Sequence, residues 1–257
     1  MKKFCFTVDD NIRFLKELTE KTPESIFDHP YLSLYRRLHE EYDLKIQLNL
    51  FYEMKDFDLS MMTDRYREEF CANADWLKLS FHSRLENVKP YEVSGYDEVY
   101  RDCANVHREI LRFAGQASLA KTTTVHYCLA TPEGLAALKD CGVKGLLGLY
   151  GRAERPRSSY QTSFEDGERI RRGEVVLDDG VIYAGIDVVT NDYSLEDNRL
   201  LLEPLLGREL IKVMIHEQYF YPDYVRHLPY FEQLLRQTFG TLRENGYVSA
   251  FFEEYLK

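Results

Sequence analysis

The sequence predicts an α/β fold of parallel strands, a distorted or incomplete (β/α)7-type barrel that forms a single domain over residues 1–257. Three observations lead to this prediction. Strand and helix patterns alternate along the chain, which implies parallel strands joined by crossover helices. The length suits one barrel domain. Acidic and histidine side chains recur where the predicted strands end. The alternation fits a barrel better than an open sheet, although periodicity alone does not separate the two.

The first predicted strand, residues 4–10, begins with aromatic and β-branched side chains, as in a strand that is buried on both faces. It ends on Asp9 and Asp10, two adjacent carboxylates. Like charges side by side disfavour ionisation unless a cation or a donor compensates, so this pair is a candidate for chemistry. The alternative is that Asp9, Asp10 or Asn11 caps the helix predicted over residues 12–21.

The next elements follow from the spacing of apolar side chains. Helical spacing predicts helices over residues 30–42, 59–74 and 96–114. Residues 44–51 alternate apolar and polar side chains with period two, which predicts a strand. Residues 76–81 return to a strand pattern that ends beside His82.

The elements from residue 122 onward continue the alternation. A β-branched strand over residues 122–129 carries His126, and Pro132 and Gly142 mark the start and the stop of a helix between them. The remaining predictions are strands over residues 143–149, 210–215 and 247–252 and a long helix over residues 224–245. The strand over residues 210–215 ends on His216.

Residues 150–198 differ from the rest of the chain because they are polar, charged and rich in glycine. Asp178-Asp179-Gly180 lies between two short strand patterns and is a hairpin signal. We interpret this region as an insertion or a decorated part of the same domain.

Composition excludes some classes of function. A formal net charge of −10 argues against nucleic acid as the main partner, and no apolar run is long enough for a membrane span. The first residues are too short an apolar stretch for a signal peptide, and the 5 cysteines show no CxxC pair, so we expect a cytoplasmic protein. The 19 Tyr and 15 Phe residues suit either a core or a groove that binds sugars. The oligomeric state stays open.

Candidate site residues stand at the carboxyl ends of the predicted strands, which converge at one mouth of a barrel. They are Asp9, Asp10, His82, His126 and His216. If residues 83–87 form a helical turn, His82 and Glu86 lie on one face and could share a metal with Asp10. Such ligands suit Zn²⁺ and also other divalent ions. The alternative is that Glu86 is a solvated loop acid.

Three motifs, in this order, resemble those of the polysaccharide deacetylases of the NodB-homology type, which have a deacetylase-like barrel. They are Val8-Asp9-Asp10-Asn11, His82-Ser83-Arg84-Leu85-Glu86 and Met214-Ile215-His216. The resemblance implies that Asp9 is the catalytic base, that Asp10 and His82 hold the metal and that His216 is the general acid.

The chain departs from the family pattern, as a divergent member would. Glu86 stands where the family has its second metal-binding histidine, and the third motif, expected around residues 124–128, lacks the arginine that orients the base. The tryptophan of the fourth motif is absent as well. His126 either replaces the arginine or is an additional ligand. Asp187 or Asp192 is a candidate to orient His216.

The resemblance implies a metal-dependent hydrolase that removes an N-acetyl group from a sugar or glycan precursor. It also implies a divalent metal cofactor, with zinc as the first choice. The backbone N–H of Tyr127 is a candidate oxyanion donor, and Tyr219 and Tyr221 are candidates for a wall of the substrate site. The alternatives are a divergent relative without this turnover, either a metal-free C–N hydrolase or a sugar-binding protein, and a scaffold protein that uses its aromatic surface.

Overall fold

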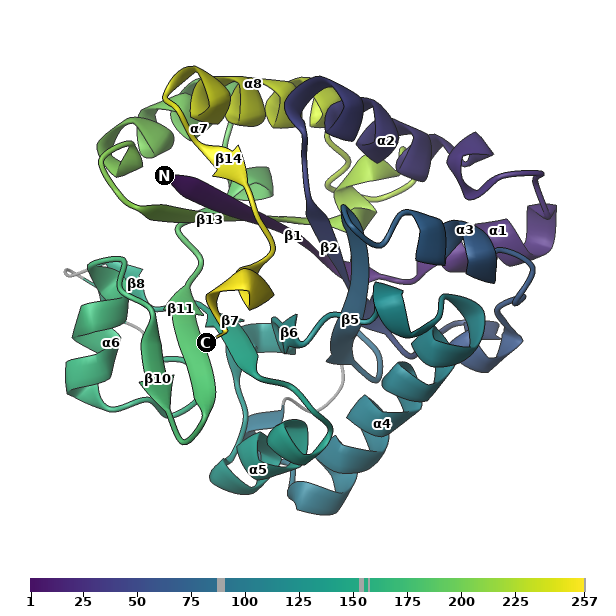
Figure 1. The fold of residues 1–257 in the computed structure, drawn as a ribbon, viewed down its shortest axis with the longest axis horizontal. Coiled ribbons are helices and arrows are strands. Elements are labelled where there is room, and N and C mark those ends of the chain that lie inside the picture. The colour runs from purple at the N-terminus through teal and green to yellow at the C-terminus, as the bar shows by residue number, and fades with distance from the viewer. Residues whose placement is uncertain (87–90, 153–154, 157, 257) are drawn as a thin grey trace.

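The computed structural model describes residues 1–86, 91–152, 155–156 and 158–256. Strands lie at the centre of the molecule, and helices surround them (Figure 1). The helices are α1 (Arg13–Lys21), α2 (Pro30–Tyr42), α3 (Arg67–Ala72), α4 (Tyr96–Phe113), α5 (Pro132–Asp140), α6 (Phe164–Arg171), α7 (Leu195–Leu202) and α8 (Phe231–Glu244).

The larger sheet is built around β1, in the order β12-β13-β1-β2-β5. Its strands are β1 (Lys3–Asn11), β2 (Ile46–Phe51), β5 (Leu77–Ser83), β12 (Val188–Val189) and β13 (Leu210–His216), and β14 (Val248–Ser249) pairs with β1. Every pair in this sheet is parallel among the described residues. The carboxyl ends of β1, β5 and β13 therefore lie at the same edge.

The second sheet has the order β10-β11-β7-β6. Its strands are β6 (Thr122–Thr123), β7 (Gly145–Gly148), β10 (Val176–Asp178) and β11 (Val181–Gly185). β6, β7 and β11 are parallel, and β10 and β11 form the antiparallel hairpin predicted at residues 178–180. Two small antiparallel pairs complete the strands described: β3 (Glu53–Met54) with β4 (Phe57–Asp58), and β8 (Gly151–Arg152) with β9 (Arg155–Pro156).

Backbone hydrogen bonds connect the two sheets on both sides. Ala120 N donates to Leu79 O at 2.9 Å beside β5, and Asp187 N donates to Lys212 O at 2.8 Å beside β13. The strands therefore form a distorted barrel of parallel strands rather than one open sheet, as the alternation predicted.

Several predicted elements are shorter in the structure, among them the strand predicted over residues 247–252, which reduces to β14. The helix predicted over residues 59–74 reduces to a 3-10 turn, Leu59–Met61, and α3, because Met62 has an extended backbone. The helix predicted over residues 224–245 begins only at Phe231, after Pro229, which has no N–H to donate in a helix. The strand predicted over residues 122–129 ends at Thr123, before a turn in which Tyr127 and Cys128 have positive φ angles.

Residues 150–198, interpreted from the sequence as an insertion or a decorated region, contribute to both sheets. β11 pairs with β7, and β12 pairs with β13. The polar composition of the region reflects α6 and the hairpin, which lie at one side of the molecule (Figure 1). These residues therefore help to complete the barrel.

The two faces of β1 have different roles. Phe4 and Phe6 face outward and pack on Phe239 of α8 with ring centroids 5.7 and 4.9 Å apart, and Phe6 also contacts Tyr35 of α2. These aromatic contacts fix β1 against the helices by burying large apolar areas. The alternate residues of the strand face the barrel interior, and Asp9 is among them.

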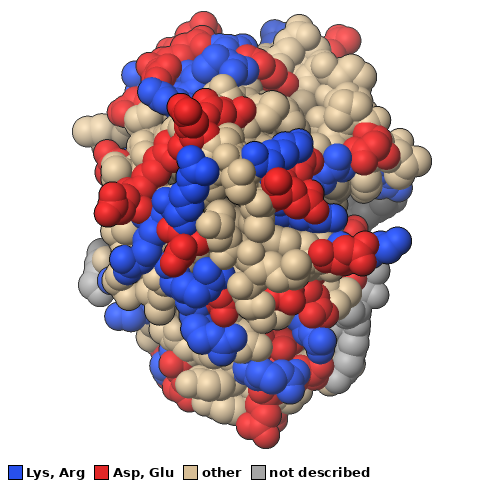
Figure 2. Space-filling view, turned by 90° about the vertical axis from the view of Figure 1, so that its right-hand side faces the viewer, with Lys and Arg blue, Asp and Glu red and all other residues tan. Residues whose placement is uncertain are grey.

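The surface charge agrees with the composition. Basic and acidic side chains both cover the face drawn in Figure 2, where a run of basic side chains in the left half is flanked by acidic ones. Within the residues that the structure describes, the longest and most apolar helices still fall short of what a membrane crossing requires.

Candidate active site

The predicted functional side chains meet at the carboxyl ends of the strands. Asp9 of β1 pairs in register with His216 of β13, and β5 carries His82 two places away across the sheet. Pairing between β1 and β2 is irregular between Val8 and Asn11, where Asp10 has a φ of 62°. Consecutive side chains of a regular strand point to opposite faces, and this irregularity brings both Asp9 and Asp10 to the site.

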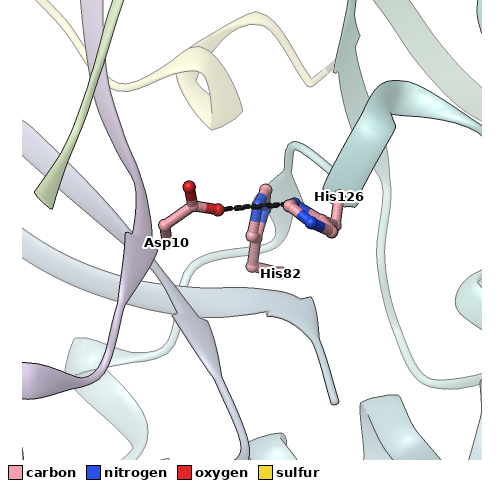
Figure 3. Close-up of side chains that lie close together, drawn as sticks. All are labelled: Asp10, His82 and His126. Atoms are coloured by element: carbon pink, nitrogen blue, oxygen red, sulfur yellow. Dashed lines mark hydrogen bonds and ion pairs between the residues drawn. The ribbon is translucent and has the colours of Figure 1, made fainter. Parts of the chain in front are cut away.

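Asp10, His82 and His126 form a group whose ligand atoms face one another (Figure 3). His82 Nε2 lies 3.0 Å from Asp10 Oδ1 and 3.1 Å from His126 Nδ1. His126 Nδ1 lies 3.3 Å from Asp10 Oδ1. Phe51 packs on both imidazoles, with ring centroids 5.2 and 5.1 Å away, and so covers one side of the group.

The donor set fits a divalent cation. His82 Nδ1 faces the carbonyl oxygen of Thr124, which can only accept, so this nitrogen carries the proton and Nε2 presents a lone pair to the site. Two imidazole nitrogens and a carboxylate oxygen this close need a proton or a cation between them. Ligand atoms about 2.0–2.1 Å from a tetrahedral zinc lie roughly 3.3 Å apart, which is near the distances found here.

The carboxylate of Asp10 is held in its charged form. Burial acts to raise its pKa, but hydrogen bonds with His126 and His82 hold the pKa of Asp10 well below its usual range. Gln218 Nε2 donates to Asp10 Oδ2 at 2.7 Å, so Oδ1 is the oxygen that faces the histidines. Burial acts to lower the pKa of His82, but the carboxylates of Asp9 and Asp10 act to raise it. The pKa of His82 lies above its usual value as a result.

Asp9 lies beside this group but is not a member of it. Its side chain is buried, and its Oδ1 accepts a hydrogen bond from Asn49 Nδ2 at 2.7 Å. Burial raises the pKa of Asp9, while the positive charge of His82 and of His216 and the Asn49 bond act against this. A carboxylate with a raised pKa is a stronger proton acceptor near neutral pH.

His216 is oriented by Asn191, a residue between the two candidates named from the sequence. Its Nδ1 lies 2.8 Å from Asn191 Oδ1, and Asn191 Nδ2 donates to Asp192 Oδ1 at 3.0 Å. The Asp192 carboxylate only accepts, so it fixes the amide of Asn191, and His216 must donate from Nδ1. The Nε2 of His216 is left for proton transfer. Asp187 instead pairs with Lys212 and Arg208.

Glu86 is not in the group of potential ligands. β5 continues through Ser83, and residues 84–86 form a bend and a turn. The helical turn expected over residues 83–87 also reaches Asn87, which lies outside the described residues. The side chain of Glu86 is exposed and lines the cavity beside the site. His126, and not Glu86, lies with Asp10 and His82 in the group of potential metal ligands among the described residues.

A cavity of about 460 Å³ opens next to Asp10. Its lining includes Phe51, Tyr221 and Tyr224 together with the charged residues Arg13 and Glu86. A larger cavity, of about 650 Å³, lies at the amino ends of the strands, where Leu210 is the first residue of β13 and Ile182 the second of β11. Sites in barrels of parallel strands form at the carboxyl ends, so the smaller cavity is the candidate substrate site.

The three tyrosines named from the sequence lie near the site in different ways. The ring of Tyr127 is half exposed and lies 4.1 Å from the His126 ring, centroid to centroid. Tyr219 is buried and packs 6.0 Å from the His216 ring. Tyr221 lines the cavity with its ring, while its hydroxyl donates to Glu217 Oε1 at 2.9 Å.

The helix cap suggested for Asp9, Asp10 or Asn11 is supplied by another residue. The carboxylate of Glu217 accepts hydrogen bonds from the backbone N–H groups of Ile12, Arg13 and Phe14, at the start of α1. Asp9 and Asp10 therefore do not cap α1, which was the alternative to a catalytic or metal-binding role for them.

Sequence reasoning missed four residues that organise the site. Asn49, Asn191 and Gln218 contact Asp9, His216 and Asp10, and the hydroxyl of Tyr160 accepts a hydrogen bond at 3.1 Å from Val125 N, next to His126. A signal for Asn49 was present, since a polar side chain inside a buried strand faces either solvent or a polar interior. Nothing in the local sequence marks the other three, because their partners are distant along the chain.

The chain matches no protein-family model, and no curated protein matches it in sequence. Solved structures match its fold. A family 4 acetyl xylan esterase from Clostridium thermocellum, in complex with cobalt, is 12% identical with a TM-score of 0.56, over 98% of this chain and 89% of the esterase. A peptidoglycan N-acetylglucosamine deacetylase is 12% identical with a TM-score of 0.51, over 98% of this chain and 86% of the deacetylase.

A 4-α-glucanotransferase from Thermococcus litoralis is 13% identical with a TM-score of 0.58, over 100% of this chain and 40% of the transferase. At these identities the likeness shows the fold, which is that of the polysaccharide deacetylases, as the three motifs predicted. Since a transferase shares the fold, the activity of this chain has to be argued from its site.

Proposed function

We propose that this protein is a metal-dependent hydrolase that removes an N-acetyl group from a sugar or a glycan precursor. One observation carries the proposal: a carboxylate and two imidazoles suited to a divalent cation stand beside a separate pair of proton-transfer groups, Asp9 and His216. A metal-dependent amide hydrolase uses a metal site and proton-transfer groups next to each other.

Asp10, His82 and His126 would hold the cation. When bound, it supplies Lewis-acid activation of the amide carbonyl and of water. We propose zinc, because imidazole nitrogens with a carboxylate oxygen, and room left for substrate, are typical of catalytic zinc sites. Gln218 and Thr124 fix the orientations of Asp10 and His82 and thereby the direction of their donor atoms.

Asp9 and His216 divide the proton transfers between them. Asp9 takes a proton from the attacking water, and its buried position favours this because burial raises the pKa of Asp9. His216 holds its Nδ1 proton against Asn191 and gives a proton from Nε2 to the departing nitrogen. The C–N bond breaks, and acetate and a free amine leave the site.

The cavity beside Asp10 suits a carbohydrate. Its aromatic and apolar residues can pack on the faces of a sugar ring, and its charged residues can bond the hydroxyls. The N-acetylglucosamine deacetylase and the acetyl xylan esterase of the same fold are named for acetylated carbohydrates, which supports this choice of substrate class.

The direct test measures acetate release by zinc-loaded protein from N-acetylhexosamines that are free, nucleotide-linked or oligomeric. We expect turnover of at least one class, and a loss of about 10²-fold or more in Asp9→Asn with zinc retained. Zinc-loaded protein that releases no acetate from any of them would contradict the proposal. Equilibrium binding of the same sugars without turnover would then favour a sugar-binding protein.

A further inference from the structure

We propose that Asn49 positions the base Asp9, and that a chain of hydrogen bonds from Thr122 through Gln47 fixes the direction of the Asn49 amide. This assigns to β2 the task that the family resemblance gives to an arginine of the third motif, and it rests on the proposed function of Asp9. The four residues come from β1, β2 and β6, and all of them are buried.

The distances connect these residues without a gap. Asn49 Nδ2 donates to Asp9 Oδ1 at 2.7 Å, and Asn49 Oδ1 accepts from Gln47 Nε2 at 2.7 Å. Gln47 Nε2 also donates to Thr122 O at 2.9 Å, and Gln47 Oε1 accepts from Thr122 Oγ1 at 2.9 Å. Each bond is within the normal range for its atom types.

The backbone carbonyl of Thr122 sets the polarity of the chain. A carbonyl oxygen only accepts, so the nitrogen end of the Gln47 amide must face it. That nitrogen also lies against Asn49 Oδ1, which leaves the nitrogen end of Asn49 for Asp9. The backbone carbonyl of Thr122 thus determines, through Gln47, that Asn49 presents its nitrogen to Asp9.

The other candidate for orienting Asp9 makes contacts elsewhere in the site. His126, which the sequence left open as a replacement for the arginine, directs its Nδ1 to Asp10 and His82. A neutral amide also differs from an arginine in its effect. Asn49 orients the carboxylate of Asp9 without placing a positive charge beside it.

The test compares three variants with the wild-type protein, loaded with zinc. Asn49→Ala removes the donor, and Gln47→Glu keeps the size of the side chain but replaces the nitrogen that holds Asn49. Ser80→Ala is the matched control, since Ser80 Oγ donates at 2.8 Å to the same Thr122 carbonyl and is equally buried, with no bond to Gln47, Asn49 or Asp9 among the described contacts.

We expect Asn49→Ala and Gln47→Glu to lower kcat for acetate release by up to about 10²-fold with KM and zinc content near wild type. Ser80→Ala should keep the wild-type kcat. A wild-type kcat in both Asn49→Ala and Gln47→Glu would overturn the positioning role of Asn49, and the proposed function would still stand. Gln47→Glu keeps the test decisive if Asn49→Ala does not fold.

Crystal structures of the same variants give a reading that does not depend on turnover. We expect the carboxylate of Asp9 to rotate away from its wild-type position in Asn49→Ala and Gln47→Glu, and to keep it in Ser80→Ala. An unmoved Asp9 carboxylate in both variants would overturn the positioning role. If wild-type protein releases no acetate, the proposed function fails separately, and these structures still decide whether Asn49 orients Asp9.

Discussion

Asn191 determines which nitrogen of His216 is available for proton transfer. Asn191→Leu removes the acceptor for the Nδ1 proton and lets the imidazole turn or change tautomer. We expect kcat for acetate release to fall by about 10- to 100-fold, a part of what general acid catalysis contributes. Steady-state kinetics on zinc-loaded protein check this.

Asp192→Asn is the matched control for that prediction. An asparagine at this position still accepts the hydrogen bond from Asn191 Nδ2, so the loss of kcat should be smaller than in Asn191→Leu. Wild-type kcat in Asn191→Leu would show that His216 needs no partner at Nδ1, and the role given to Asn191 would be wrong.

At the scale of residues, the side chains that stand at strand ends were predictable and their supports were not. Asp9, Asp10, His82 and His216 follow strands whose patterns are evident in the sequence. Glu86 was named as a ligand from its spacing to His82, but spacing places two residues on one face only where the chain is helical, and β5 runs on through Ser83. His126 reaches the site from the 3-10 turn His126–Cys128, which follows β6 and has no helical spacing to mark it.

Glu217 ties the start of α1 to the segment after β13. Its carboxylate accepts three backbone hydrogen bonds, from Ile12, Arg13 and Phe14, at 2.7, 3.0 and 2.8 Å. Glu217→Ala leaves these donors without their acceptor, and each unsatisfied buried donor costs about 1–3 kcal/mol. We expect the free energy of unfolding to fall by about 2–4 kcal/mol, measured by urea denaturation.

Glu217→Gln removes the negative charge of the carboxylate and keeps the size of the side chain. The glutamine keeps one carbonyl oxygen, which can accept two of the bonds, so its loss of stability should lie between those of wild type and Glu217→Ala. Equal stability of Glu217→Ala and wild type would contradict the role of Glu217 as the cap of α1.

His107 makes the contact of α4 with the end of α5 sensitive to pH. It is buried, its Nε2 lies 3.7 Å from Cys103 Sγ, and burial lowers the pKa of His107 to about 4. The unfolded chain binds the proton with an ordinary pKa near 6.5, so the unfolded state gains protons first as the pH falls. The stability that depends on neutral His107 is present above pH ~6.5 and is lost towards pH ~4, by up to about 3 kcal/mol.

The measurement is the free energy of unfolding of wild type and His107→Leu at a series of pH values. The difference between the two proteins should shift in favour of the leucine variant as the pH falls from about 6.5 to 4, because leucine takes up no proton. A difference that stays constant over this range would show that His107 is protonated equally in both states.

The elements were predictable where periodicity was long and failed where a single residue interrupts it. The predicted bounds of α2 and β13 agree closely with those in the structure, because the apolar sides of both elements are continuous. α8 begins later than predicted because Pro229 interrupts the helix. The short strands of residues 150–198 gave a weak signal, since two-residue strands such as β12 carry too few side chains to show a period.

In the whole molecule, the candidate metal site spans the joint between the two sheets. Asp10 and His82 belong to β1 and β5 of the larger sheet, and His126 follows β6 of the second. Such a site exists only in the folded chain. Free zinc at 100 times its Kd should then raise the free energy of unfolding by about 2.7 kcal/mol. For a chain of this size this corresponds to a rise in Tm of roughly 5–10 °C.

A thermal melt with and without zinc measures this effect. Asp10→Asn is the control, because it keeps the size of the side chain and removes the charge that faces both histidines. The Tm of this variant should respond much less to zinc. An equal rise in Tm for both proteins would mean that zinc binds elsewhere on the chain.

The alternation of elements predicted parallel strands and favoured a barrel over an open sheet, but it does not say which strands lie side by side. Here β13 lies beside β1, and that register brings His216 next to Asp9, although 206 residues lie between them in the chain. Only the tertiary structure brings the two proton-transfer groups together.

The most direct test of the central claim is the zinc content of purified protein in wild type and in His82→Ala, His126→Ala and Glu86→Ala. We predict about one zinc per chain in wild type and in Glu86→Ala, and a loss of zinc in the two histidine variants, because the ligand group comprises Asp10, His82 and His126. Wild-type protein that takes up no zinc would contradict the account. So would a Glu86→Ala variant that loses zinc while His126→Ala retains it.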